Sequence, residues 1–138
     1  MVNLIDLYRL AERKDHNIYW FSFYDERVAS VSVQDSYGYC EIAIDPTKIT
    51  CESDEKLKLA HELGHCETGS FYNRWATCDI REKHELRADR WAIKKLLPKE
   101  ELYAAIKDQR YRCKIAEIFS VPESLVEKAL EYYTQETG

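Results

Sequence analysis

Residues 61–65 read His-Glu-Leu-Gly-His, a pattern whose residue types and spacing suit metal chemistry. Four residues advance an α-helix by about 400°, so the imidazoles of His61 and His65 would lie roughly 40° apart around the helix and about 6 Å apart along it. Both rings can then reach one ion at the ~2.0–2.1 Å of a zinc–nitrogen bond. Glu62 lies on the adjacent part of the helix surface, where it can approach a metal-bound water without being a ligand. The pattern predicts a metal site with Glu62 as general base; the alternative is a surface helix with two titrating histidines.

A third ligand is predicted on the next helix, where residues 84–89 read His-Glu-Leu-Arg-Ala-Asp. The intervening chain is long enough to end one helix and begin another, so Glu85 can return to the ion and complete a site of three protein ligands and one water. Asp89 lies one turn beyond Glu85 and can accept the second ring N–H of a ligating histidine. The alternative for both carboxylates is exposed charge pairing with neighbouring basic residues. His84 faces about 100° away from Glu85, so a surface or structural role is expected.

The ligand set predicts hydrolysis of a peptide bond. Two neutral imidazoles and one carboxylate leave a zinc site that lowers the pKa of a bound water and polarises a carbonyl. Glu62 would take the proton of that water and deliver it to the leaving amine. A further donor should stabilise the oxyanion, and the candidates are Tyr72, Arg74 and Trp75 in an aromatic loop. About one zinc ion per chain is expected, although manganese and iron accept the same ligand types.

The elements that must position these residues follow from hydrophobic periodicity and turn signals. An amphipathic helix is expected over 3–13, then three strands in a meander over 18–23, 27–33 and 39–44. The helix of the His-Glu pattern is expected over 54–67 with Ser53 as its N-cap, and the second ligand helix over 80–97 with a capping box from Asp79 to Glu82. Helices from Pro98, over 110–119 and over 123–133 follow. The predicted class is α+β, with a small, three-stranded, mainly antiparallel sheet packed on the first ligand helix and a helical C-terminal part over about 99–134.

Composition places the chain among globular proteins. It has 138 residues, 45% hydrophobic and 33% charged, which fits one domain over 1–138. The net charge of −5 gives no basic footprint for nucleic acid. The N-terminal residues lack the features of a signal peptide, and the apolar stretches are short, so a cytoplasmic protein without membrane contact is expected.

The five cysteines are odd in number and none forms a Cys-x-x-Cys pair. We therefore expect reduced thiols that act as small buried hydrophobic side chains. Cys66 follows the second predicted ligand, but it points about 100° away around a helix and is not expected to bind the metal.

The ligand helices resemble the ImmA/IrrE family of bacterial and phage metallopeptidases, and more broadly the small gluzincins. The similar stretches are Leu59–His65, Glu85–Ala92 and the Leu-Leu-Pro sequence at 96–98. The resemblance covers roughly 18–133 and is most specific over 57–98. The chain departs from the family at 87–91, where it has Arg-Ala-Asp-Arg-Trp and the family often has Glu-Ala-Asn-x-Phe. These changes spare the predicted metal ligands.

The resemblance implies a specific protein substrate, a phage-type or mobile-element repressor with a helix-turn-helix domain, whose cleavage would release repressed genes. In similar peptidases a sheet edge above the zinc binds the substrate as an added strand. We expect Tyr39–Ile44 to be this edge, with Tyr39 and Glu41 contacting the substrate together with Tyr72 and Trp75. The alternative is that 39–44 is an ordinary core strand.

Two other function classes are weighed against the enzyme. One is a non-catalytic, metal-containing binding module or antirepressor that acts by protein contact, for which Glu62 would be dispensable. The other is a DNA-binding regulator, because 114–133 has the rhythm of a helix-turn-helix. Its second helix is acidic, however, and acidic residues do not face phosphate. Packing of this segment against the core, or docking of a repressor, is therefore favoured over DNA binding.

Overall fold

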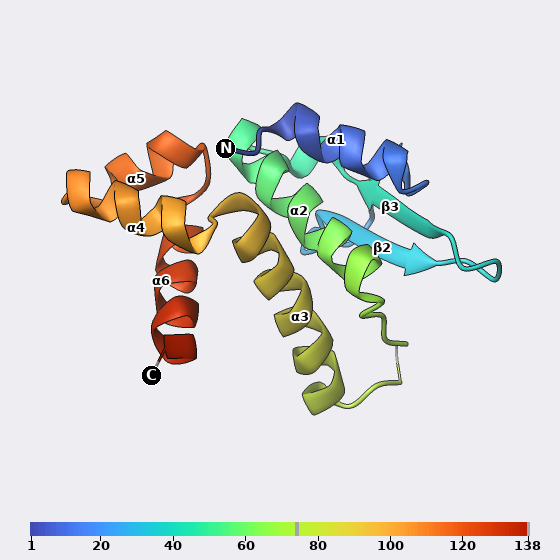
Figure 1. The fold of residues 1–138 in the computed structure, drawn as a ribbon. Coiled ribbons are helices and arrows are strands. Elements are labelled where there is room, and N and C mark those ends of the chain that lie inside the picture. Colours follow the sequence, from blue (N-terminus) through green and yellow to red (C-terminus); the bar gives the residue numbers. More distant parts are fainter. Residues whose placement is uncertain (74, 138) are drawn as a thin grey trace.

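The computed structural model of the chain describes residues 1–73 and 75–137 (Figure 1). The predicted α+β class is confirmed. The elements, in chain order, are α1 (Leu4–Arg13), β1 (Asn17–Trp20), β2 (Ser30–Gln34), β3 (Cys40–Ile44), the short 3-10 helix η1 (Pro46–Lys48), α2 (Glu52–Thr68), α3 (Cys78–Leu96), α4 (Lys99–Asp108), α5 (Arg112–Phe119) and α6 (Glu123–Thr137).

The three strands form a mixed sheet in the order β1-β3-β2. β2 and β3 are an antiparallel hairpin, with Ser30 opposite Ile44 and Gln34 opposite Cys40. β1 instead runs parallel to β3 on its other side. The expected meander is therefore wrong, because the chain leaving β1 crosses to the far edge before β2 begins and returns through the centre. This topology makes β2 an edge strand and β3 the central one.

One face of the sheet packs against the helices. Residues alternate along β3, so Cys40, Ile42 and Ile44 are buried on the helix side. Their partners include Leu59 and Leu63 of α2, which are fully buried. In Figure 1, α1 and α2 lie over the sheet, α3 lies beside α2, and α4, α5 and α6 gather at the end away from the sheet. The core thus runs along α2, which carries the first predicted ligands.

The helix boundaries differ from expectation by a few residues for identifiable reasons. α2 begins after Cys51, two residues earlier than a Ser53 cap would allow, and ends at Gly69, whose φ of 66° is left-handed. α3 begins after Thr77, whose side chain accepts the Ile80 N–H, so the expected capping box at Asp79 is inside the helix.

Helices α2 and α3 touch at Gly64. A Cβ atom at this position would lie 2.6 Å from the carbonyl oxygen of Ala88 and 3.0 Å from its Cα. Only glycine permits this approach of two backbones. The contact lies between the predicted ligands of α2 and those of α3, and therefore sets the distance between them.

The C-terminal helices pack on the same core. The buried Nζ of Lys56 in α2 donates to the carbonyl of Phe119 at 2.6 Å, and the Tyr133 hydroxyl donates to the carbonyl of Leu97 at 2.7 Å. The apolar positions of 114–133 are largely buried in this packing, among them Ile115, Phe119 and Val126. Of the two interpretations favoured for this segment, these contacts agree with packing against the core, and docking of a repressor stays a prediction.

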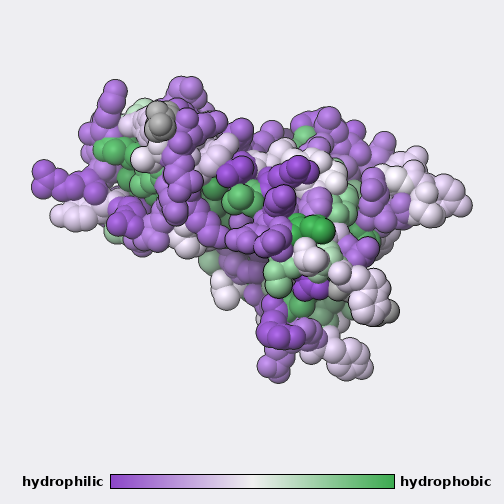
Figure 2. Space-filling view, turned by 90° about the horizontal axis from the view of Figure 1, so that it is seen from below, coloured by the Kyte–Doolittle hydropathy of each residue, from purple (hydrophilic) through white to green (hydrophobic). Residues whose placement is uncertain are grey.

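The surface is dominated by polar residues. Seen from below the view of Figure 1, apolar residues form separate small patches within a mostly hydrophilic surface (Figure 2). Among the described residues, no helix has both the length and the apolar character that a bilayer crossing needs.

Candidate metal centre

Helix α2 carries three predicted site residues on two successive turns. The rings of His61 and His65 lie side by side, with centroids 4.8 Å apart and planes at 87°. Glu62 is on the neighbouring arc and only 5% exposed. The helical period places the two imidazoles together and the carboxylate beside them, as the spacing predicted.

Helix α3 brings Glu85 to the same point. Its Oε2 lies 2.7 Å from Nε2 of His61, and its Oε1 lies 3.2 Å from Nε2 of His65. One ligand atom from each of the three residues lies within 4.8 Å of the others, which is the size of a metal site. The structure therefore brings together all three side chains that the sequence proposed as ligands.

The other nitrogen of each ring has a fixed acceptor. Nδ1 of His61 lies 2.8 Å from Oδ1 of Asp89, and Nδ1 of His65 lies 2.5 Å from the carbonyl of Ser70. Both partners accept a hydrogen bond from an Nδ1–H, so each neutral ring turns its Nε2 lone pair toward Glu85. Asp89 thus occupies the predicted supporting position. The Ser70 carbonyl was missed, because a backbone acceptor leaves no mark in the residue types.

This arrangement fits a cation. Two imidazole lone pairs face the oxygens of a carboxylate at hydrogen-bonding distance, and acceptors so placed repel one another unless a positive charge lies between them. A proton on a ring can supply that charge, and so can a divalent ion with nitrogen and oxygen ligands. The donor set of two histidines and one carboxylate is that of zinc peptidase sites, with room left for a water.

Without an ion, protons take its place. Burial lowers the pKa of His61, but contacts with Asp89 and Glu85 outweigh it and raise that pKa to about 10. For His65, burial again lowers the pKa, and Glu85 and the Ser70 carbonyl raise it on balance. Hydrogen bonds from His61 and His65 hold the pKa of Glu85 well below its usual value. The directions agree, because the carboxylates favour protonated imidazoles and the imidazoles favour an ionised Glu85.

Glu62 faces a cleft of about 570 Å³ beside β2. Its two carboxylate oxygens accept hydrogen bonds from the Ser30 and Ser32 hydroxyls, both at 2.7 Å. Ser30 and Ser32 alternate with Val31 and Val33, whose side chains point outward and are exposed. The polar positions of β2 thus face the helix, the reverse of an amphipathic strand, because a charged group lies there. The serines were missed, since this contact is visible only once β2 is placed against α2.

Of the loop candidates for the oxyanion donor, Tyr72 lines the cleft, next to Ser70 and Phe71. The Tyr72 hydroxyl donates to Oε1 of Glu85 at 2.7 Å, and burial, followed by this contact, raises its pKa to about 12. The ring of His84 stacks on Tyr72, a structural contact for that histidine. Trp75 is 79% exposed and is not among the residues that line the cleft. The other candidate, Arg74, lies outside the described residues.

The prediction that Tyr39–Ile44 forms an edge of the sheet is wrong. Strand β3 occupies the centre of the sheet and has strands on both sides. Tyr39 lies in the turn before it, and Glu41 accepts a hydrogen bond from the Asn17 amide at 3.1 Å. Neither residue lines the cleft. The edge strand beside the predicted ligands is β2, which sequence alone could not separate from β3.

The expectation of uniformly reduced thiols is also wrong. Cys40 and Cys66 form a disulfide with Cα atoms 5.8 Å apart, whereas Cys51, Cys78 and Cys113 are free and exposed. The pair is distant in sequence and meets only because the start of β3 packs on the last turn of α2. As expected, Cys66 points away from the predicted metal centre.

Two histidines from one helix and a carboxylate from a second form a group that could hold a metal ion, which fits the metallopeptidase class of protein. A family model described as the IrrE N-terminal-like domain, of the M78 peptidases, matches residues 13–131. The chain belongs to this ImmA/IrrE family, which supports a metallopeptidase type of function, a bound metal and a protein substrate. No curated protein and no solved structure matches the chain.

Proposed function

We propose that the chain, acting as one domain, is a zinc-dependent endopeptidase in which His61, His65 and Glu85 hold the ion. The observation that carries this proposal is the convergence of two imidazole Nε2 atoms on one carboxylate, with each Nδ1 held by an acceptor. That pattern orients lone pairs toward a single point before any ion binds. A zinc ion bound there would activate a water and polarise the scissile carbonyl.

Glu62 acts as the general base in this proposal. It takes a proton from the attacking water and passes it to the leaving amine. The Ser30 and Ser32 hydroxyls hold its carboxylate at the cleft, and the low exposure of Glu62 restricts other orientations. Tyr72 is the proposed donor to the developing oxyanion, because its phenol already lies 2.7 Å from Glu85 at the rim of the site.

The substrate is proposed to bind along β2. This strand pairs with β3 on one side only among the described residues, and residues 27–33 line the cleft beside Glu62. An extended peptide can hydrogen-bond to such an edge as an additional strand. A peptide bound in this way would run beside Glu62 and the predicted ligands, which line the same cleft.

The proposed substrate is a helix-turn-helix repressor of phage or mobile-element type, in the cytoplasm, whose cleavage derepresses genes. Membership of the ImmA/IrrE family supports a protein substrate, and the resemblance in the ligand helices favours this kind of repressor. Such a protein would be recognised through β2 and the cleft, which lie beside the predicted ligands.

The test uses the full chain and a helix-turn-helix repressor from the same genome, beginning with any that is encoded beside its gene. Glu62→Gln should keep its zinc and lose cleavage by about 10²–10⁴-fold, because the amide cannot accept the proton of water. Zinc is measured by elemental analysis and cleavage by mass spectrometry of the repressor. Glu82→Gln, an exposed position of α3, is the matched control and should cleave normally. Full cleavage by Glu62→Gln would contradict the assigned base.

The same experiment separates the enzyme from the binding module. A module that acts by contact would relieve repression in cells equally well as Glu62→Gln, with the repressor remaining intact. The proposal predicts that this variant leaves the repressed genes silent.

A further inference from the structure

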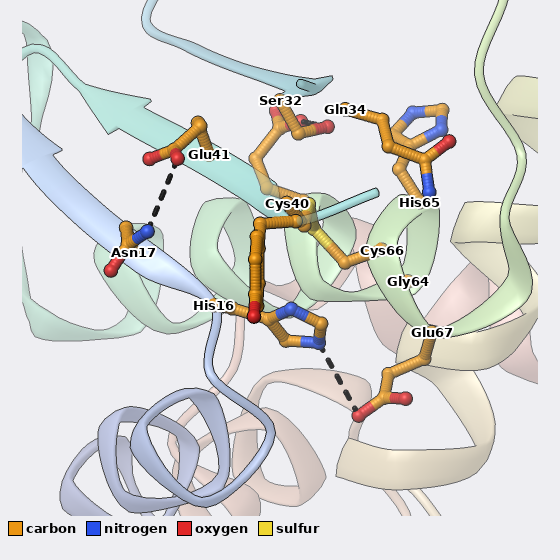
Figure 3. Close-up of a disulfide and its surroundings, with 12 residues drawn as sticks. His16, Asn17, Ser32, Gln34, Cys40, Glu41, Gly64, His65, Cys66 and Glu67 are labelled. Carbon is orange, nitrogen blue, oxygen red and sulfur yellow. Dashed lines mark hydrogen bonds and ion pairs between the residues drawn. A yellow bond between two sulfur atoms is a disulfide. The ribbon is translucent and has the colours of Figure 1, made fainter. Parts of the chain in front are cut away.

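A second group of metal-ligating side chains lies outside the proposed active site. One ring nitrogen of His16 and the sulfurs of Cys40 and Cys66 all lie within 4.8 Å of one another. Figure 3 shows the His16 ring between the cysteine pair and the side chain of Glu67. The four residues come from three places, the turn before β1, the start of β3 and the last turn of α2.

The sheet register explains why they meet. Asn17 of β1 pairs with Glu41 of β3 in the parallel ladder, which puts His16 alongside Cys40. Cys40 is buried on the helix side of β3, like Ile42. That face packs on the last turns of α2, where Cys66 lies. The grouping is therefore a product of the fold and not of neighbouring sequence.

Two polar atoms in this group are buried without a hydrogen bond. Nε2 of His16 and Oε1 of Glu67 have no hydrogen-bond partner among the described residues. They lie 3.7 Å apart, and their side chains are only 12% and 20% exposed. Because these two atoms face each other, Glu67 holds the His16 ring through Nε2. The other ring nitrogen, Nδ1, is then the atom available to a cation beside the two sulfurs.

We propose that His16, Cys40 and Cys66 form a second metal site, for zinc or another thiophilic divalent cation, when the two cysteines are reduced. Glu67 receives the other N–H of His16 and orients the ring toward the ion. The disulfide is the metal-free state of the same cysteine pair. Neither state depends on the proposed peptidase chemistry, since the site shares no residue with His61, Glu62, His65 or Glu85.

The geometry permits both states. Zinc–sulfur bonds of ~2.3 Å and zinc–nitrogen bonds of ~2.0–2.1 Å place ligand atoms of a tetrahedral site about 3.4–3.8 Å apart. The three donors already lie within 4.8 Å, and the Cα atoms of the cysteines are 5.8 Å apart. Rotation of the cysteine side chains can separate the sulfurs without movement of β3 or α2. A water fills the fourth position.

The two states interconvert by oxidation. A peroxide such as hydrogen peroxide takes two electrons from the thiolates of Cys40 and Cys66, which form the S–S bond. The peroxide O–O bond breaks, two protons are taken up, two waters form, and the cation is released. A dithiol reductant reverses the sulfur chemistry and restores the two ligands. The site thus couples metal occupancy to the redox state of the chain.

Cobalt(II) distinguishes this site from the proposed active site. Thiolate ligands give cobalt an intense sulfur-to-metal charge-transfer band in the near ultraviolet, and His61, His65 and Glu85 contain no sulfur. Titration of the reduced, metal-free full chain with cobalt chloride should produce this band. Cys40→Ser and Cys66→Ser should each reduce it by at least about tenfold, whereas Cys113→Ser, at an exposed cysteine, should leave it intact.

Two further experiments test the role of Glu67 and the control of metal binding by oxidation. Glu67→Gln should weaken cobalt binding at this site by about 10–100-fold while the circular dichroism spectrum stays native. Hydrogen peroxide should abolish the band, and a dithiol should restore it. A reduced wild-type chain without the band would overturn the proposal, as would a band of wild-type intensity in Cys40→Ser. Neither result would affect the cleavage test of Glu62→Gln.

Discussion

The two histidines of the metal centre differ in what holds them. His61 is oriented by the carboxylate of Asp89, whereas His65 is oriented by the backbone carbonyl of Ser70. A carboxylate can be removed by substitution and a carbonyl cannot. Asp89 is therefore the residue through which the support of the ligands can be tested without touching a ligand.

Asp89→Asn should weaken zinc binding by about 10–100-fold, because an amide oxygen accepts the Nδ1 proton of His61 more weakly than a carboxylate does. Competition with a coloured chelator measures the dissociation constant. Asp79→Asn, an exposed acid in the first turn of the same helix, serves as the control. Equal affinities of Asp89→Asn and wild type would show that Asp89 does not support the ion.

Tyr72→Phe should lower the rate of repressor cleavage by about 10²–10³-fold with unchanged zinc content, if its phenol donates to the oxyanion. The rate is measured with zinc-loaded protein at saturating substrate. Tyr24→Phe, at a fully solvent-exposed tyrosine, should cleave at the wild-type rate. If Tyr72→Phe bound less zinc but its zinc-loaded form cleaved at the wild-type rate, the phenol would only position Glu85 and would not stabilise the oxyanion.

At the scale of elements, the contact of α2 with α3 decides whether the ligands meet. Gly64 lies between the two histidine turns, and its missing side chain lets Ala88 approach. The side chains of Glu85 and Asp89 reach the histidines only at this separation. The ligand geometry therefore depends on a residue that carries no functional group.

Gly64→Ala should separate the helices. Alanine improves helix propensity by about 1 kcal/mol, but its Cβ would collide with backbone atoms of Ala88 that have no rotamer to change. We expect a net destabilisation of about 1–3 kcal/mol and a loss of zinc affinity, measured by urea unfolding and chelator competition. Zinc affinity equal to wild type would contradict the role of this contact.

The parts of the site whose placement follows from the helical repeat could be predicted from the sequence. His61, Glu62 and His65 are placed by the 3.6-residue turn, and Glu85 and Asp89 by the same turn on a second helix.

Sequence reasoning failed where the pairing of segments distant in the sequence decides the structure. The strands have similar composition, so the sequence does not reveal the order β1-β3-β2. Without that order, the edge position of β2, the serines that hold Glu62 and the contact of Cys40 with Cys66 could not be predicted.

At the scale of the whole molecule, the metal centre links stability to pH. In the metal-free chain the pKa of His61 is about 10, compared with an ordinary value of 6.5. The folded state therefore binds this proton more tightly than the unfolded state. Its contribution to stability is complete below about pH 6.5 and is lost as the pH rises from there through about 10.

The chelator-treated chain should accordingly lose stability between pH 6.5 and pH 10, measured as the free energy of unfolding in urea. In His61→Gln the free energy of unfolding should fall less steeply over this pH range, because the imidazole that releases the proton is absent. Zinc should reverse the trend, because protons compete with the metal for the rings and its binding strengthens as the pH rises. A slope identical in wild type and His61→Gln would contradict the coupling.

The central claim is that two imidazoles and one carboxylate surround a single ion. The most direct measurement is an anomalous difference map from zinc-loaded crystals, with data collected on both sides of the zinc absorption edge. The account predicts a peak at bonding distance from Nε2 of His61, Nε2 of His65 and a carboxylate oxygen of Glu85. The account would be contradicted if the three side chains were ordered, no peak lay among them, and Nε2 of His61 remained in direct contact with the carboxylate of Glu85.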